Sequence, residues 1–504
     1  MKHIFHIILL AITVLKYNVV VSQENSIYDV LSIKLQDIGP ILKDSEVTGY
    51  YMFYKTDKLS KDTSSYVIDI LDQNLNILIS KPINGSDQLK LLDGVYNNKT
   101  LLLKFYDYLT KEITLSQYDN GANEISKVIR KLSSYESYII ERTFSDNGGQ
   151  NVCVFPLEKT GFVDYRGIKN KKYGYNIDLY SSTDSNKIWT LTSEVKSKLH
   201  EFATHIYGDK NVIVSSILSK KTLLTRSIDI SILAINAKTG EKMFEKPIVD
   251  PNYELLVLNG LESDLEGNIY LLGNYFPKGK SELNNPSLGI FTIKLDIQGN
   301  IIEKNFISWE EDIGKLIDVN NYGKIKDGGY VYFHDFVRDA NGNIYAIGEQ
   351  FKKRNKFYET DMIIGDLLII ELDKNATLKN VNVIDNEKFR IVLPEGMGIN
   401  GPQILSYYIK SKGWFNFQFI EFNRDQSIFS IGYYERNNNK DSFKLDFGIT
   451  TYADGELSQD RINLLNTNEN KMVRVLPAKI GNIAIIEYLI DEKLLKMRIE
   501  KINY

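Results

Sequence analysis

Short runs of mostly hydrophobic residues, separated by turns rich in Asp, Asn and Gly, occupy most of the chain. Between Tyr332 and Ile384 four such runs follow one another, with turns that begin at Asp339 and Asp373. Short runs rich in β-branched and aromatic residues are typical of β-strands, and these turn residues are typical of hairpins. The stretch therefore predicts a small antiparallel sheet, which cannot bury both of its faces without neighbours.

The same plan recurs along the chain. Residues 255–307 carry turns at Asp264 and Asp296 that align with those at Asp339 and Asp373. Self-similarity at such a long period is typical of repeat architectures, and four-stranded sheets repeated radially form a β-propeller. We therefore expect an all-β fold. The first hairpin turns of the units fall near Asp44, Asn98, Thr160, Asp209, Asp264, Asp339, Asp425 and Gly481.

These turns favour eight four-stranded blades, and seven blades is the alternative because the unit around Thr160 is the faintest match. The last unit offers only three strands, over Val473 to Pro477, Asn482 to Ile490 and Leu494 to Ile502. An unpaired strand, Val30 to Leu35, precedes the first unit. We expect this N-terminal strand to complete the last blade and close the ring.

Glycine and proline give two local expectations. Gly267 and Gly342 stand where a hairpin turn needs a positive φ, which glycine adopts without strain. Pro82 and Pro247 lie in two similar segments, Ile79 to Ile83 and Phe244 to Ile248. Because proline has no N–H to donate, both segments should be edge strands, the outermost of their blades.

The N-terminus predicts export. Residues 1–22 combine Lys2, an apolar run and the small residue Ser22, which is the pattern of a signal peptide. The run is too short for a membrane span, so residues 23–504 should form one domain in the periplasm or outside the cell. Cys153 is the only cysteine, so no internal disulfide is expected. The 61 basic residues less Lys2 and Lys16 leave 59 against 65 acidic ones, which argues against a nucleic-acid partner.

Four long segments interrupt the regular plan: 274–288, 308–329, 352–365 and 385–413. The first and third connect middle strands, and the others connect blades. In a propeller all four then fall on one face, here over blades five to seven, and long loops on a rigid scaffold commonly carry binding sites. Ser308-Trp309-Glu310-Glu311 has the spacing of a capping box, so we expect a short helix there.

Large aromatic residues accompany these insertions. Such side chains stack on sugar rings or receive the apolar anchors of a partner protein. The alternative is that they pin their loops to the blades. The candidate ligand-binding residues are Tyr275, Trp309, Tyr322, Tyr358 and Trp414.

No pattern of catalytic or metal-ligating residues stands out. His200 and His205 are five apart, whereas a zinc helix needs four, and in a strand they would point to opposite faces. His334 begins an inner strand and could line the central channel, although a hydrogen-bonded structural histidine is the simpler interpretation. The turn at Asp339 lacks the distal Glu of a calcium loop. We therefore expect no metal and no cofactor, and name no catalytic residue.

One segment carries a resemblance to a known family. Val47 to Asp57, followed by Tyr66 to Leu75, resembles the opening of an uncharacterised family of exported bacterial proteins, a domain of unknown function. The resemblance implies export and a propeller-like repeat fold, and it implies no catalytic residues.

The sequence favours a monomeric, non-enzymatic propeller that binds a protein or cell-surface ligand through the loop-rich face of blades five to seven. The rival hypothesis is a carbohydrate-active enzyme or lectin that uses carboxylates in the central channel and the same aromatic residues. A third is a structural envelope component without a discrete site.

Overall fold

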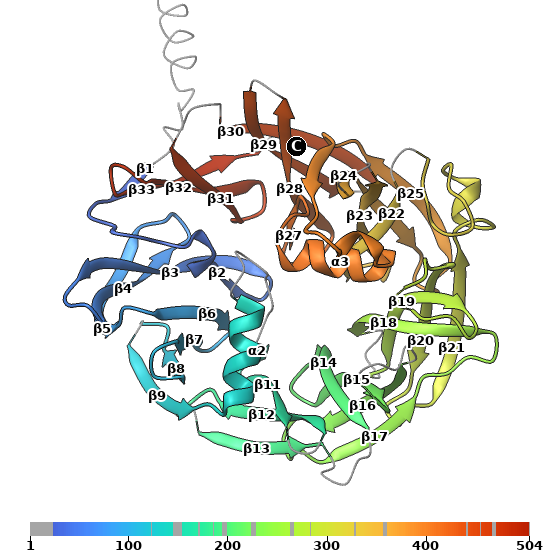
Figure 1. Cartoon of the computed structure of the whole chain (residues 1–504), viewed down its shortest axis with the longest axis horizontal. Coiled ribbons are helices and arrows are strands. Elements are labelled where there is room, and N and C mark those ends of the chain that lie inside the picture. The colour runs from blue at the N-terminus through green and yellow to red at the C-terminus, as the bar shows by residue number, and fades with distance from the viewer. Residues whose placement is uncertain are drawn as a thin grey trace, which may run out of the picture.

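Eight antiparallel sheets stand radially around a central channel in the computed structural model (Figure 1). The structure describes residues 24–502 except 122, 145–153, 170–171, 185, 194–198, 223–227, 263–266, 283, 327–328, 356–359, 440–441, 454 and 466–469. Seven of the eight first-hairpin turns lie between the two innermost strands of a blade, and the eighth, at Asp264, lies outside the described residues. The eight sheets confirm the choice of eight blades over seven. The blade around Thr160 matched faintly because its inner strand, β10, has only 4 residues.

The strands run outward from the channel in chain order. Blade one contains β2 (Ile38–Lys43), β3 (Glu46–Lys58), β4 (Thr63–Asp72) and β5 (Ile77–Ser86); blade two, β6 (Leu89–Tyr96), β7 (Leu101–Asp107), β8 (Glu112–Tyr118) and β9 (Glu124–Lys131); blade three, β10 (Val154–Leu157), β11 (Gly161–Lys169), β12 (Tyr173–Ser181) and β13 (Lys187–Thr192); blade four, β14 (His200–Gly208), β15 (Val212–Lys220), β16 (Asp229–Asn236) and β17 (Lys242–Pro247). Blade five contains β18 (Tyr253–Glu262), β19 (Ile269–Pro277), β20 (Gly289–Leu295) and β21 (Ile301–Ser308); blade six, β22 (Tyr330–Arg338), β23 (Ile344–Asn355), β24 (Thr360–Leu372) and β25 (Leu378–Ile384), with β26 (Phe389–Val392) added beside β24; blade seven, β27 (Phe417–Phe422), β28 (Ile428–Asn439), β29 (Ser442–Ala453) and β30 (Glu456–Leu465).

Blade eight joins the two ends of the chain. Its strands are β31 (Lys471–Pro477), β32 (Asn482–Leu489), β33 (Leu494–Lys501) and, outermost, β1 (Glu24–Ile27), which is antiparallel to β33. Closure of the ring by an N-terminal strand is thus confirmed, but the predicted strand Val30 to Leu35 is wrong. Those residues cross from blade eight to blade one and pair only at Ser32, which bridges to Lys55.

The alternation in that segment has a different cause. Val30, Ile33 and Leu35 are buried in one hydrophobic cluster with residues of blades one and eight. The segment is therefore a wedge between two sheets, and the spacing of its buried residues, three and then two, records burial against their facing surfaces and not strand pairing. The Tyr488 hydroxyl fixes the wedge by donating to the Val30 carbonyl oxygen at 2.9 Å.

The core lies between blades. Each large cluster combines residues of neighbouring blades, such as Ile347 of blade six with Ile431 of blade seven. Middle strands are covered on both faces, which is why β19 is buried along nearly its whole length and reads as a continuous apolar run. Pro82 and Pro247 lie in β5 and β17, the outermost strands of their sheets, as predicted.

Gly267 and Gly342 have φ of 80° and 86°, so the expected turn conformation is confirmed. Replacing Gly267 with valine is expected to lower the free energy of unfolding by about 1–2 kcal/mol, because a β-branched residue is strained at positive φ. A Cβ atom there would meet only Ile297 Cγ2, at 3.4 Å, so crowding adds little. Asparagine tolerates this conformation, so Gly267→Asn should cost less than about 0.5 kcal/mol. Urea denaturation checks both variants, and equal losses would contradict the turn assignment.

Candidate functional site

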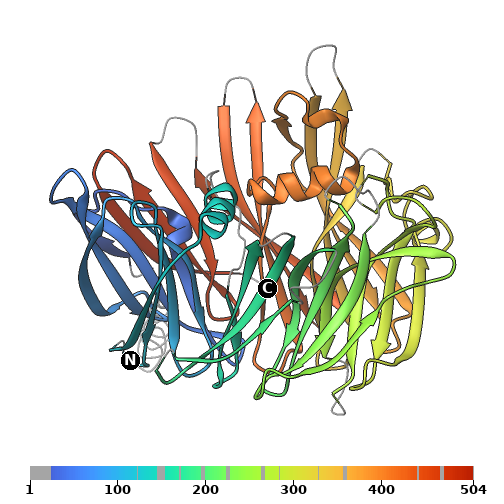
Figure 2. The same ribbon diagram turned by 60° about the horizontal axis from the view of Figure 1, so that its bottom comes forward.

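The long connections and the middle-strand hairpins share one face of the ring, which we call the loop-rich face (Figure 2). It carries α2 (Ser134–Phe144) between blades two and three, η2 (Ile313–Lys315) between blades five and six, and η3 (Met397–Ile399) with α3 (Pro402–Ser411) between blades six and seven. In Figure 1 α2 and α3 both lie toward the channel. No helix in the described part of the chain has the length and hydropathy needed to cross a membrane.

The predicted insertions have more regular structure than expected. Residues 352–365 belong largely to extensions of β23 and β24, so a free loop there is wrong, and β26 pairs with the extended part of β24. The helix expected at Ser308 is reduced to turns and the 3-10 helix η2. The Ser308 hydroxyl accepts from the Glu311 N–H at 3.2 Å, as the capping box predicts, but the Ser308 N–H donates to Asp312, at 2.8 Å, where the box predicts Glu311.

Two of the five candidate aromatic residues are buried. Trp309 is 1% exposed, and its indole N–H donates to Ser287 Oγ at 3.0 Å. Tyr275 packs edge-to-face on Tyr253. Trp309 holds its loop against Phe333 of blade six, and Tyr275, itself in β19, packs within blade five. Such a structural role was the alternative for these residues, and neither offers an open platform.

The remaining candidates are placed differently. Tyr322 is 45% exposed. Trp414 is partly exposed, follows α3, and packs edge-to-face on Tyr408 at 5.6 Å between ring centroids. Tyr358 lies outside the described residues. Sequence reasoning missed Ile399, which is 89% exposed on η3, because an isolated isoleucine in a loop carries no signal in the sequence.

Helix α3 packs over blade six on the loop-rich face. Leu405 and Ile409 enter a cluster with Phe351, Met362 and Phe415. At the start of the helix, a Cβ atom on Gly401 would lie 2.3 Å from the carbonyl oxygen of Asn284. The connection between blades six and seven therefore touches the 274–288 insertion of blade five, and the two form one continuous surface.

Beneath α3, His334 occupies the extra position of a β-bulge, where the β22–β23 register shifts between Phe333 and Asp335. Its Nδ1 lies 3.3 Å from Lys410 Nζ, and its Nε2 lies 3.1 Å from Glu349 Oε2. The ammonium group can only donate, so Nδ1 accepts and Nε2 carries the proton that is donated to Glu349. Burial, with the nearby Lys410 charge, holds the pKa of His334 well below its usual range, so the ring is neutral.

Glu349 also binds the backbone. It accepts from the N–H groups of Asn416 and Phe417 at 2.9 and 3.0 Å. Burial raises its pKa to about 7, although these amides and nearby cations act in the opposite direction. The triad of His334, Glu349 and Lys410 thus ties α3 and the start of blade seven to blade six. This arrangement agrees with the interpretation of His334 as a structural histidine, whose ring is held by side chains of other elements.

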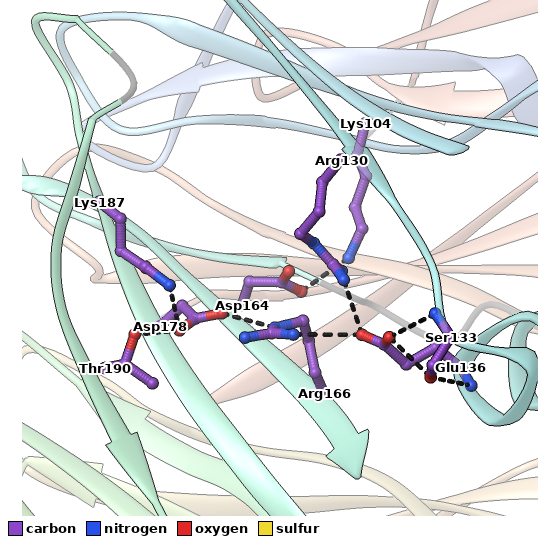
Figure 3. Close-up of polar contacts among 9 residues, drawn as sticks. All are labelled: Lys104, Arg130, Ser133, Glu136, Asp164, Arg166, Asp178, Lys187 and Thr190. Atoms are coloured by element: carbon purple, nitrogen blue, oxygen red, sulfur yellow. Dashed lines mark hydrogen bonds and ion pairs between the residues drawn. The ribbon is translucent and has the colours of Figure 1, made fainter. Parts of the chain in front are cut away.

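Helix α2 was missed by the sequence analysis, although its signal was present. Ser133-Ser134-Tyr135-Glu136 is a capping box: the Ser133 hydroxyl accepts from the Glu136 N–H at 3.2 Å, and the Glu136 carboxylate accepts from the Ser133 N–H at 2.9 Å. Figure 3 shows the same carboxylate between Arg130 and Arg166, at 2.7 and 3.1 Å. Burial alone would raise the pKa of Glu136, but the capping amide and Arg130 lower it to about 2.

A recess opens between blades four and five on the loop-rich face, with a volume of about 980 Å³. The start of β16 and the end of β17 form one wall, and the start of β18 with the 274–288 insertion forms the other. It was not predicted, since its walls come together only in the folded ring. The lining residues are 228–230, 247–250, 253–255, 278–282, 284 and 285.

The fold and this face define an eight-bladed β-propeller whose connections are elaborated on one side. The chain belongs to a family of unknown function, DUF6770, whose model matches residues 1–503. This confirms the resemblance seen in the opening segment, while export and a bacterial source stay predictions. No curated protein matches the chain.

Several solved structures resemble the chain only in outline. Sqt1 from Saccharomyces cerevisiae is 9% identical with a TM-score of 0.37, over 96% of this chain and 98% of Sqt1. The WD40 domain of SCAP from fission yeast is 8% identical with a TM-score of 0.35, over 95% and 94%. Prolyl oligopeptidase B from Galerina marginata is 9% identical with a TM-score of 0.42, over 92% of this chain and 55% of that one.

Proposed function

We propose that this protein is an exported, monomeric, non-enzymatic β-propeller that binds a protein or cell-surface ligand through the loop-rich face. The observation that supports it most is the contact of Gly401 with Asn284, because it joins insertions from different blades into one surface beside the recess. Exposed apolar side chains, Tyr322 and Ile399 among them, lie on that surface. Rigidly held loops with exposed apolar anchors suit recognition of a partner.

The hydrogen bonding and burial of the acids near the inner strands favour ligand binding over glycoside hydrolysis as the function. Glycosidases need two carboxylates that face the substrate. Glu349 is occupied by backbone amides and His334, and Asp335 accepts from Asn259 Nδ2 at 3.2 Å. Burial raises the pKa of Asp335 to about 6, which reflects its enclosure in protein.

Replacing Trp414 or Tyr322 with alanine is expected to weaken ligand binding, by about 2 kcal/mol or more if the residue is a hot spot. Ile297→Ala is the matched control, because Ile297 is 50% exposed in the turn between β20 and β21, on the opposite face. The mature protein recovered after export is tested against a glycan array and fractionated cell-envelope extract, and its intact mass checks cleavage after Ser22. The Kd for any ligand found is then measured with each variant.

If both aromatic variants change the Kd no more than Ile297→Ala does, the loop-rich face is not the binding surface. A ligand that protects the β20–β21 turn from hydrogen exchange would assign binding to the opposite face.

A further inference from the structure

Glu282 is the most unusual side chain of the recess. It is 3% exposed, and its Oε2 atom has no hydrogen-bond partner in the part of the chain that the structure describes. Among the described residues, no lysine or arginine pairs with it. Burying a carboxylate without a counter-charge is unfavourable for folding. A group retained in this state next to an open recess suggests that its partner comes from outside the chain.

The other charges of the recess leave an excess of negative charge. Lining acids are Asp229, Asp250, Glu254 and Glu282, whereas the lining bases are Lys278 and Lys280. Lys278 pairs with Glu254 at 3.4 Å and also donates to the carbonyl oxygens of Asp250 and Tyr253, at 2.9 and 3.4 Å. Asp250 is paired with Lys304 at 2.9 Å.

The negative charge of the recess acts on the pKa of Glu282. Burial raises the pKa of Glu282, and the negative charges of Glu254 and Asp229 raise it further, while its own backbone N–H and Lys220 oppose the rise. An added positive charge would therefore be stabilised in the recess.

The apolar part of the lining indicates which kind of cation would fit the recess. Ile228, Ile230, Pro247, Ile248 and Leu255 supply apolar wall. Lysine and arginine combine an aliphatic stem with a charged head, and they bury the stem along apolar surface. In the described part of the chain, no three His, Cys, Asp or Glu side chains are grouped so as to hold a metal ion.

We propose that the recess between blades four and five receives a lysine or arginine side chain of the partner, with its charged head at Glu282. This rests on the proposed function, because the recess opens on the loop-rich face. The ammonium or guanidinium group would donate to the Glu282 carboxylate, and its stem would lie against the apolar wall. The recess volume of about 980 Å³ leaves room for residues that flank the bound side chain.

The test uses the mature protein and fluorescein-labelled hexalysine and hexaarginine, with binding followed by fluorescence anisotropy. Glu282→Gln keeps the size of the side chain and removes its charge. Glu456→Gln is the matched control, because it removes one negative charge from the exposed first residue of β30, on the opposite face. Glu282→Gln should weaken binding about 10-fold or more, and Glu456→Gln less than about 2-fold.

Stability provides a second readout. Since Glu282→Gln removes a buried charge that no described residue neutralises, its thermal midpoint at pH 7.5 should equal or exceed that of the parent protein. Loss of binding with retained or increased stability would support a ligand role. Equal weakening by the two glutamine variants would instead assign peptide binding to general surface charge and overturn the proposal.

Spermidine and arginine amide are run as competitors to identify the source of the cation. A peptide partner should bind at least about 10-fold more tightly than either, because flanking residues add contacts that a free amine lacks. Equal affinity would assign the recess to a small amine. Binding of neutral oligosaccharides but not of the basic peptides would overturn the proposal that the recess binds a cationic group. If Trp414→Ala weakens ligand binding and Glu282→Gln does not, this inference fails while the proposed function stands.

Discussion

A mature protein shortened to begin at Gln36 is expected to lose about 5 kcal/mol or more of its free energy of unfolding. The deletion removes β1 together with Val30, Ile33 and Leu35, which are buried between blades one and eight. Burial of each such side chain contributes about 1.5–3 kcal/mol. The deletion also leaves the buried Tyr488 hydroxyl without its acceptor at Val30. Urea denaturation would measure the loss, on the condition that the unfolding free energy falls with urea concentration at the same slope in both proteins.

A second truncation separates the strand from the wedge. A protein that begins at Tyr28 loses β1 but keeps Val30 to Leu35, and it should lose much less stability. The reason is that β1 has only four residues, alternately exposed and partly buried. Equal losses in the two truncations would show that pairing with β33, and not burial of the wedge, holds the ring closed.

Lys104→Met is expected to destabilise the protein by about 3–5 kcal/mol, because it leaves a buried carboxylate without its counter-charge. Lys104 of blade two and Asp164 of blade three lie 2.6 Å apart, with side chains 6% and 2% exposed (Figure 3). The ion pair therefore joins neighbouring blades in a region from which water is excluded.

The double variant Lys104→Met/Asp164→Leu should recover most of that loss, because replacing both members of a buried pair by apolar residues is often nearly neutral. Lys159→Met, at an exposed position, serves as the control and should have little effect. Thermal and urea denaturation of the variants supply the comparison. A double variant as unstable as Lys104→Met would show that packing of the lysine stem, and not its charge, accounts for the loss.

Strands and turns could be predicted because their determinants are local. Asp339 accepts from the N–H groups of Asn341 and Asn343, and the positive φ of Gly342 completes the turn, all within five residues. The closing strand was misplaced because alternation reports burial and not pairing. Leu31 to Leu35 alternates as regularly as a strand, although the backbone bonds of Val30, Leu31 and Ser32 scatter between Lys493 and Lys55.

The site was predicted less completely, since burial of a loop residue depends on contacts distant in the sequence. The positions of the insertions followed from topology, so the loop-rich face could be expected. Trp309, in contrast, is buried against Phe333 of the next blade, and nothing near it in the sequence indicates this. Glu282 likewise looks like an ordinary surface glutamate until blades four and five stand side by side.

The pairing of Glu24 with Arg498 sets an order of events in folding. Nearly the whole chain must be synthesised, and on the proposed route exported, before β33 exists as a partner for β1. Until then the outer edge of blade eight is open, and the wedge has only blade one to cover it. Contacts of such long range form slowly and leave partly folded chains prone to association. Ring closure is therefore the step at which folding and aggregation compete.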